Sequence, residues 1–82
     1  MRNKLLIEAV GTFFLCLASL TDGGPLPVAA LLCALIYMGA PVSLAHYNPA
    51  VSLAFRLRGR AGTRAFWAYV GVQLTAALLA AM

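Results

Sequence analysis

Long apolar runs separated by short polar breaks divide this chain into segments. Apart from Glu8, residues 5–20 are almost wholly apolar, and similar runs cover 27–44 and 64–82. A helix needs about 20 predominantly apolar residues to cross a bilayer. Runs of this length therefore predict membrane-spanning helices at about 4–20, 27–44 and 64–82.

The polar breaks carry residues typical of turns and helix starts. Thr21-Asp22-Gly23-Gly24-Pro25 is rich in turn residues and predicts the first loop. Pro27 suits the first turn of the next helix, and Thr63 suits the N-cap of the last one. Between them, the arginine- and glycine-rich stretch 56–62 predicts a basic loop.

A fourth, shorter segment begins at Asn48. Asn is a preferred N-cap, and Pro49 suits the first helical position, where its missing N–H costs nothing. Proline also disfavours helical backbone in the residue before it, so a break is expected at Asn48. A helix over about 49–57 is roughly 15 Å long at 1.5 Å per residue, about half of a ~30 Å hydrocarbon core. The pattern predicts a re-entrant half-helix with its N-terminus in mid-membrane.

Composition supports a single all-α integral membrane domain over 1–82. Of its 82 residues, 63% are hydrophobic and 10% are charged, and the mean hydropathy is +0.92. A soluble domain of this size cannot bury so much apolar surface. Cys16 and Cys33 lie inside apolar runs and are expected to pack there. The cysteines and the one histidine do not form a metal-ligand pattern, so no metal or other cofactor is predicted.

The six basic residues flank the apolar segments rather than forming a soluble basic face. With Met1 cytoplasmic, three spans and one half-span place all of them on the cytoplasmic side, as the positive-inside rule requires. We therefore expect contacts with lipid headgroups and none with nucleic acid. The expected membrane is a bacterial-type inner or plasma membrane. These residues are Arg2, Lys4, Arg56, Arg58, Arg60 and Arg64.

A secretory signal peptide is the alternative interpretation of the first segment. Arg2 and Lys4 followed by an apolar run resemble the start of one. Glu8 within the run, and the lack of a small-residue cleavage site, argue for a spanning helix instead.

Three motifs resemble the aquaporin and glycerol-facilitator family. Ser-Leu-Ala-His-Tyr-Asn-Pro-Ala-Val at 43–51 is similar to the family's first signature, S-G-A-H-x-N-P-A-V. Residues 8–13, Glu-Ala-Val-Gly-Thr-Phe, resemble the E-x-x-G-T-F of the first helix. Gln73 with Ala76-Ala77 resembles the A-Q-x-x-G-A of the third helix. The matches come in the family's order and extend over nearly the whole chain.

The resemblance implies one repeat of a two-repeat architecture: three transmembrane helices plus one re-entrant half-helix. Family members contain two such units, the second inverted, so this unit requires an inverted partner to enclose a pore. A second copy of the chain and a paralogous chain both remain open as that partner, and a four-pore oligomer follows from the family alone. The family's second signature, in which Arg follows Asn-Pro-Ala, is absent, because Val51 follows Asn-Pro-Ala here. Leu44 and Ala76 replace glycines of the first signature and of the third helix.

Asn48 is the central candidate site residue. Its amide N–H₂ can donate to a permeating oxygen while the half-helix N-terminus adds positive potential. The alternative is an ordinary helix cap in a loop. Pro49 and Ala50 fix the start of the half-helix and keep it close to the half-helix of the second unit.

Glu8, His46 and Gln73 are the candidates that support this pore loop. The resemblance implies that Glu8 accepts hydrogen bonds from irregular backbone near Asn48, which at membrane depth needs such partners, and Gln73 can do the same. A proton-carrying role for Glu8 in a coupled transporter is the alternative. His46 stabilises the loop, lines the inner vestibule, or gates it with pH.

The family's constriction positions carry over to four apolar residues: Val28, Ile36, Ala45 and Val51. A filter without a cationic donor predicts passage of small neutral solutes such as glycerol as well as water.

No catalytic dyad or phosphate loop is evident, so an enzyme is not expected. The sequence predicts a passive channel for water and small neutral solutes. Two alternatives remain: a small proton-coupled, multidrug-type exporter that uses Glu8, and a non-transporting membrane subunit.

Overall fold

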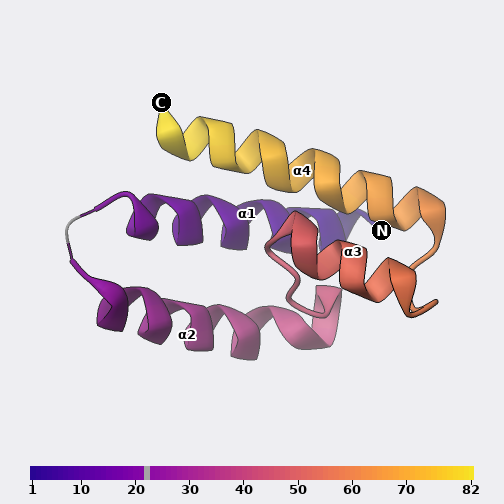
Figure 1. The fold of residues 1–82 in the computed structure, drawn as a ribbon, viewed down its shortest axis with the longest axis horizontal. Coiled ribbons are helices and arrows are strands. Elements are labelled where there is room, and N and C mark those ends of the chain that lie inside the picture. The colour runs from indigo at the N-terminus through magenta and orange to yellow at the C-terminus, as the bar shows by residue number, and fades with distance from the viewer. Residues whose placement is uncertain (22) are drawn as a thin grey trace.

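The computed structural model describes residues 1–21 and 23–82, and over these residues the chain is all-helical, as predicted (Figure 1). Asp22, in the middle of the predicted first turn, lies outside the described residues. The four helices are α1 (Arg2–Ser19), α2 (Pro25–Ser43), α3 (Pro49–Leu57) and α4 (Thr63–Ala81).

Backbone chemistry explains where these helices begin. Asn48 has extended backbone (φ −159°, ψ 130°), and its side-chain oxygen accepts a hydrogen bond from the Ala50 N–H at 2.7 Å, which caps α3. Two expectations were wrong in detail. Helix α2 begins at Pro25 rather than Pro27, because Gly24 adopts φ 84° immediately before it. The N-cap of α4 is Gly62 rather than Thr63, which is already helical.

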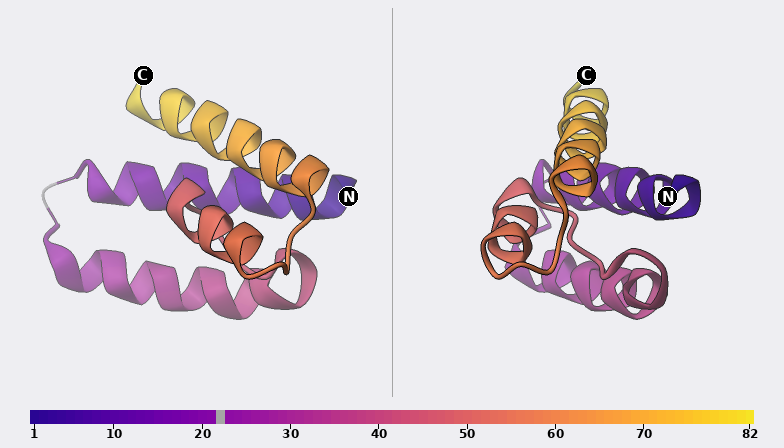
Figure 2. Two further views of the ribbon diagram at one scale, coloured as in Figure 1. Left: turned by 45° about the vertical axis from the view of Figure 1, so that its right-hand side comes forward. Right: turned by 90° about the vertical axis from the view of Figure 1, so that its right-hand side faces the viewer.

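Helix α1 lies at the centre of the arrangement. It packs against both α2 and α4, while α3 packs against α4. The views in Figure 2 show α3 beside the α1–α2–α4 layer rather than between its members. Figure 1 shows that α3 lies alongside only the half of the molecule that contains the N-terminus. A helix of nine residues therefore extends along part of the length that the 19-residue helices cover.

Two of the helices are long and apolar enough to cross a membrane. These are α2 and α4, and only 17% of each apolar window is buried inside the molecule. Most of their apolar side chains therefore face outward, as contact with lipid would require. Helix α1 is more polar because it carries Arg2, Lys4 and Glu8. The arrangement is consistent with an all-α membrane protein.

Tyr47 fills the space between α1 and α2. It is 3% exposed, and its hydroxyl donates a hydrogen bond to the Leu35 carbonyl oxygen at 2.7 Å. Gly11 on α1 and Gly39 on α2 face the ring so closely that a methyl group on either would overlap it. Tyr47 is therefore a buried packing residue between the two helices.

We expect Gly11→Ala and Gly39→Ala to destabilise the fold, because the added methyl displaces a buried, hydrogen-bonded ring. Overpacking of this kind costs typically about 1–3 kcal/mol. Gly71→Ala on α4 is the matched control, since nothing lies within 4 Å of its added Cβ. Denaturant unfolding in detergent micelles measures the difference. Equal stabilities for Gly39→Ala and Gly71→Ala would contradict the packing role of Tyr47.

Candidate functional site

The candidate site is organised around a fully buried carboxylate. Glu8 on α1 has an exposed fraction of 0%. Its Oε2 accepts from the Ser43 hydroxyl at 2.8 Å and the His46 N–H at 3.0 Å. Its Oε1 accepts from the Tyr47 N–H at 2.8 Å and the Gln73 amide at 2.9 Å. Each oxygen therefore accepts two hydrogen bonds, which uses the full acceptor capacity of an ionised carboxylate.

The loop between α2 and α3 needs these acceptors because its backbone is irregular. Leu44, Ala45 and Tyr47 adopt φ values of 70°, 54° and 57°, in the left-handed region that favours glycine. Backbone N–H groups in such a loop have no helical partners, and an unpaired buried N–H is costly. Two of these groups, the N–H of His46 and the N–H of Tyr47, donate to Glu8. The family resemblance implied hydrogen bonds of this kind from irregular backbone near Asn48.

Gln73 connects α4 to this cluster. Its Nε2 donates to Glu8 and also to the Ser52 hydroxyl oxygen on α3, at 3.0 Å. The same hydroxyl lies 2.8 Å from Nδ1 of His46. Side chains from α1, α4 and α3 and the intervening loop thus share one continuous set of buried hydrogen bonds. Among the predicted residues, the structure brings Glu8, His46 and Gln73 together.

His46 contacts two aromatic rings in addition to the Ser52 hydroxyl at Nδ1. The imidazole stacks on Phe55, with ring centroids 4.2 Å apart, and lies 4.8 Å from the ring of Tyr69. It is 6% exposed. These are contacts that a loop-stabilising residue makes, and the three roles considered for His46, including vestibule lining and pH gating, stay predictions.

Sequence reasoning missed three members of the cluster: Ser43, Ser52 and Tyr69. Tyr69 donates from its hydroxyl to the Ser43 carbonyl oxygen at 2.9 Å. It lies four residues before Gln73, a spacing that places both on one helix face. Helical spacing from Gln73 could therefore have identified it.

The start of α3 presents an exposed amide. The Asn48 oxygen caps the helix, so its amino group is left on an exposed residue at the positive end of the helix dipole. Ala50 is also exposed, and Pro49 is half-buried. No acidic residue lies in the first turn of α3 to offset that positive end.

The four predicted constriction residues do not share a described pocket. Val28 lines a space of about 480 Å³ at the ends of α1 and α2, and the other three do not line it. Ile36 and Val51 are exposed, and Ala45 is half-buried in the loop. A filter built from these positions remains a prediction.

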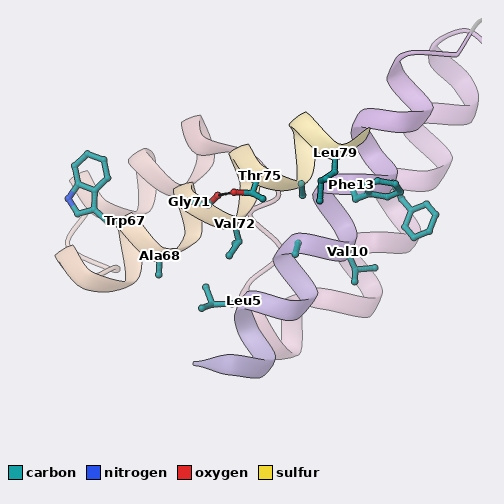
Figure 3. Close-up of a pocket in the computed structure, with 12 residues that line it drawn as sticks. Leu5, Val10, Phe13, Trp67, Ala68, Gly71, Val72, Thr75 and Leu79 are labelled. Carbon is teal, nitrogen blue, oxygen red and sulfur yellow. Dashed lines mark hydrogen bonds between the residues drawn. The ribbon is translucent and has the colours of Figure 1, made fainter. Parts of the chain in front are cut away.

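A groove of about 650 Å³ lies between α1 and α4 (Figure 3). Phe13 and Val10 on α1 and Val72 and Leu79 on α4 are among its apolar lining residues. None of the candidate site residues lines it, so this groove and the polar cluster are separate features.

A known protein resembles this chain over most of the length of the chain. The chain is 32% identical over 94 residues to aquaglyceroporin AqpS of Rhizobium meliloti (strain 1021), a match that covers 95% of this chain and 40% of that protein. The similarity supports membership of the aquaporin family. No protein-family model and no solved structure matches the chain. The chain spans about 40% of the length of this curated relative.

We expect Glu8→Gln to destabilise the fold strongly. The variant keeps the shape of the side chain but replaces one acceptor oxygen with an amino group. At least one buried loop N–H, that of His46 or Tyr47, is then left without an acceptor. An unsatisfied buried donor, together with the lost charge-assisted hydrogen bonds, predicts a loss of roughly 2–4 kcal/mol. Ser43→Ala, which removes one donor and leaves the carboxylate intact, should cost about 1 kcal/mol. Denaturant unfolding in micelles compares the two, and a Glu8→Gln variant as stable as Ser43→Ala would contradict the role given to the carboxylate.

Leu44→Gly should stabilise the fold by roughly 0.5–1 kcal/mol, because glycine adopts a positive φ without steric cost. Leu44 is 57% exposed. The position therefore favours glycine for its backbone conformation and not for close packing between helices. Leu53→Gly, at an exposed helical position of α3, should instead cost about 1 kcal/mol. Unfolding measurements that gave the two variants changes of the same sign would count against this explanation.

Proposed function

We propose that this chain forms one half of a passive membrane channel for water and small neutral solutes such as glycerol. The observation that carries the proposal is the exposed Asn48 at the start of a nine-residue helix, held in place through the buried Glu8 cluster. The resemblance to an aquaglyceroporin supports the same function.

In this proposal Asn48 acts at the pore axis. Its oxygen is engaged in capping α3, so its amino group donates to the oxygen of a passing water or hydroxyl. The positive end of the α3 dipole acts in the same direction. Together these groups orient the permeating molecule and disfavour protons and cations.

The proposed membrane placement follows from the arrangement of the helices. Helices α1, α2 and α4 cross the bilayer, and α3 enters it from one side only. The start of α1 and the loop between α3 and α4 lie at the same end of the molecule (Figure 1). Arg2 and Lys4 lie at the start of α1, and the four other basic residues lie in that loop or in the helix turns next to it. The positive-inside rule then makes this end cytoplasmic.

The pore also requires an inverted second half, which supplies a second half-helix. The relative is long enough to hold such a unit, since this chain corresponds to 40% of it. The second half is a further copy of this chain, a paralogous chain, or another part of the same polypeptide. The charge asymmetry favours a single orientation for this chain and hence an unlike second half, while pairing of identical chains is the commoner way to form an interface.

The exporter alternative is less well supported by the geometry of Glu8. A proton carrier must gain and lose a proton, but both carboxylate oxygens already accept two hydrogen bonds each. A proton placed on either oxygen would break or reverse one of these four hydrogen bonds. The non-transporting subunit differs from the channel by its lack of flux in pure lipid.

We expect liposomes that contain the purified chain to shrink faster than protein-free liposomes in stopped-flow osmotic assays, without a proton gradient. Asn48→Asp should abolish the excess flux, because it keeps an oxygen that caps α3 but removes the amino donor. Asn3→Ala, at an exposed asparagine on α1, is the matched control and should leave the flux unchanged.

Flux that survives Asn48→Asp, or that depends on a pH gradient, would contradict the channel. Exclusion of glycerol would contradict the apolar filter while leaving water conduction standing. No flux from the folded chain alone would contradict a channel made of identical halves, and co-reconstitution with an inverted half then tests the remaining forms of the proposal.

A further inference from the structure

A second pocket, of about 140 Å³, lies on the side of the Glu8 cluster that faces the basic end of the molecule. One water needs only about 10–15 Å³ of space measured in this way, so the pocket has room for a larger polar group. It is separate from the apolar groove of Figure 3. Its walls come from α1, the loop before α3, α3 itself and the start of α4, and include Lys4, His46, Ser52, Arg60, Gly62 and Phe66.

Two cationic side chains from distant parts of the sequence line this pocket. Lys4 belongs to α1, and Arg60 belongs to the loop before α4. No carboxylate lines the pocket among the residues that the structure describes. Glu8 lies nearby in the cluster but is fully buried and accepts from four donors. The charged side chains that line the pocket in the described part of the chain are therefore all cationic.

The N-terminus of α4 adds to this positive charge. Its N-cap, Gly62, has no side chain to cap the helix, and no acidic residue lies in the first turn. The first N–H groups of a helix have no partner within it, and here they lie beside Gly62 and Ala65, which line the pocket. Such a helix start favours a bound anion.

The imidazole of His46 provides an independent reason to expect a ligand. Gln73 Nε2 donates to the Ser52 oxygen, and the Ser52 hydroxyl hydrogen finds an acceptor when it points at Nδ1 of His46. We therefore assign the tautomer that carries its ring hydrogen on Nε2, since it leaves the fewest groups of this network unpaired. Nε2 of His46 is buried and makes no hydrogen bond within residues 1–21 and 23–82. A buried donor in the pocket wall calls for an acceptor.

We propose that this pocket binds a phosphate group. Phosphate oxygens accept hydrogen bonds from Arg, Lys and helix N-termini, and their negative charge complements all of the donors gathered here. The group comes either from the headgroup of an anionic lipid or from a free phosphate ester. The inference does not depend on the channel function, because neither Asn48 nor a second half takes part.

The test is isothermal titration calorimetry on the full chain in a non-ionic detergent. The probes are short-chain phosphatidylglycerol, glycerol 3-phosphate, inorganic phosphate and a phosphate-free short-chain diacylglycerol. The Lys4→Gln/Arg60→Gln double variant removes both cations of the pocket. Arg2→Gln/Arg58→Gln removes the same charge from exposed positions that do not line it.

We expect a phosphate-bearing probe to bind one site per chain and the diacylglycerol not to bind. The pocket variant should weaken binding about tenfold or more, since charge-assisted hydrogen bonds are lost, and the control by about twofold or less. In NMR spectra, the His46 Nε2–H resonance should shift when the probe is added.

Binding of phosphatidylglycerol alone identifies a lipid headgroup, and binding of the water-soluble probes identifies free phosphate. Equal weakening in both double variants, or no binding of any phosphate-bearing probe, would overturn the proposal.

Discussion

The structure depends above all on the buried carboxylate of Glu8. A polypeptide that turns back within an apolar environment must satisfy every backbone N–H that leaves a helix, because no water is present to do so. Glu8 provides that satisfaction from a neighbouring helix, with two hydrogen bonds to loop N–H groups and two to side chains. One ionisable residue on α1 thereby determines where the chain between α2 and α3 can lie.

The other features of the loop are consequences of this arrangement. Three non-glycine residues adopt positive φ, a conformation that persists only where surrounding contacts over-determine it. Tyr47 supplies such contacts by inserting its ring against Gly11 and Gly39. Gln73 and Ser52 connect the carboxylate to α3. Helix α3 is therefore positioned by buried polar contacts as well as by packing against α4, and its exposed start, with Asn48, is held in a defined place.

Sequence patterns predicted most of the fold because each helix has a local signature. Apolar runs indicated three long helices, and Asn48-Pro49 indicated the start of the short one, whose bounds the structure gives as Pro49–Leu57. The convergence of Glu8, His46 and Gln73 could be expected only from resemblance to a family, since their spacing of 38 and 27 residues contains no local geometry. Ser52 and Tyr69 were missed because a serine or tyrosine in an apolar helix is unremarkable until its neighbours are known. The positive φ of Leu44 was not predicted, although the glycine that the family signature has at this position was a signal for it.

The central claim is that α3 is a re-entrant half-helix with its N-terminus deep in the membrane. Spin labels measure this most directly, placed singly at Ala50 and at Arg58 in a background without Cys16 and Cys33, with the protein in lipid bilayers. The account predicts that the label at 50 lies near the bilayer midplane, accessible to oxygen, while the label at 58 lies at the headgroups, accessible to a polar relaxing agent. Equal, shallow depths at both positions would show that α3 lies on the membrane surface and would contradict the account.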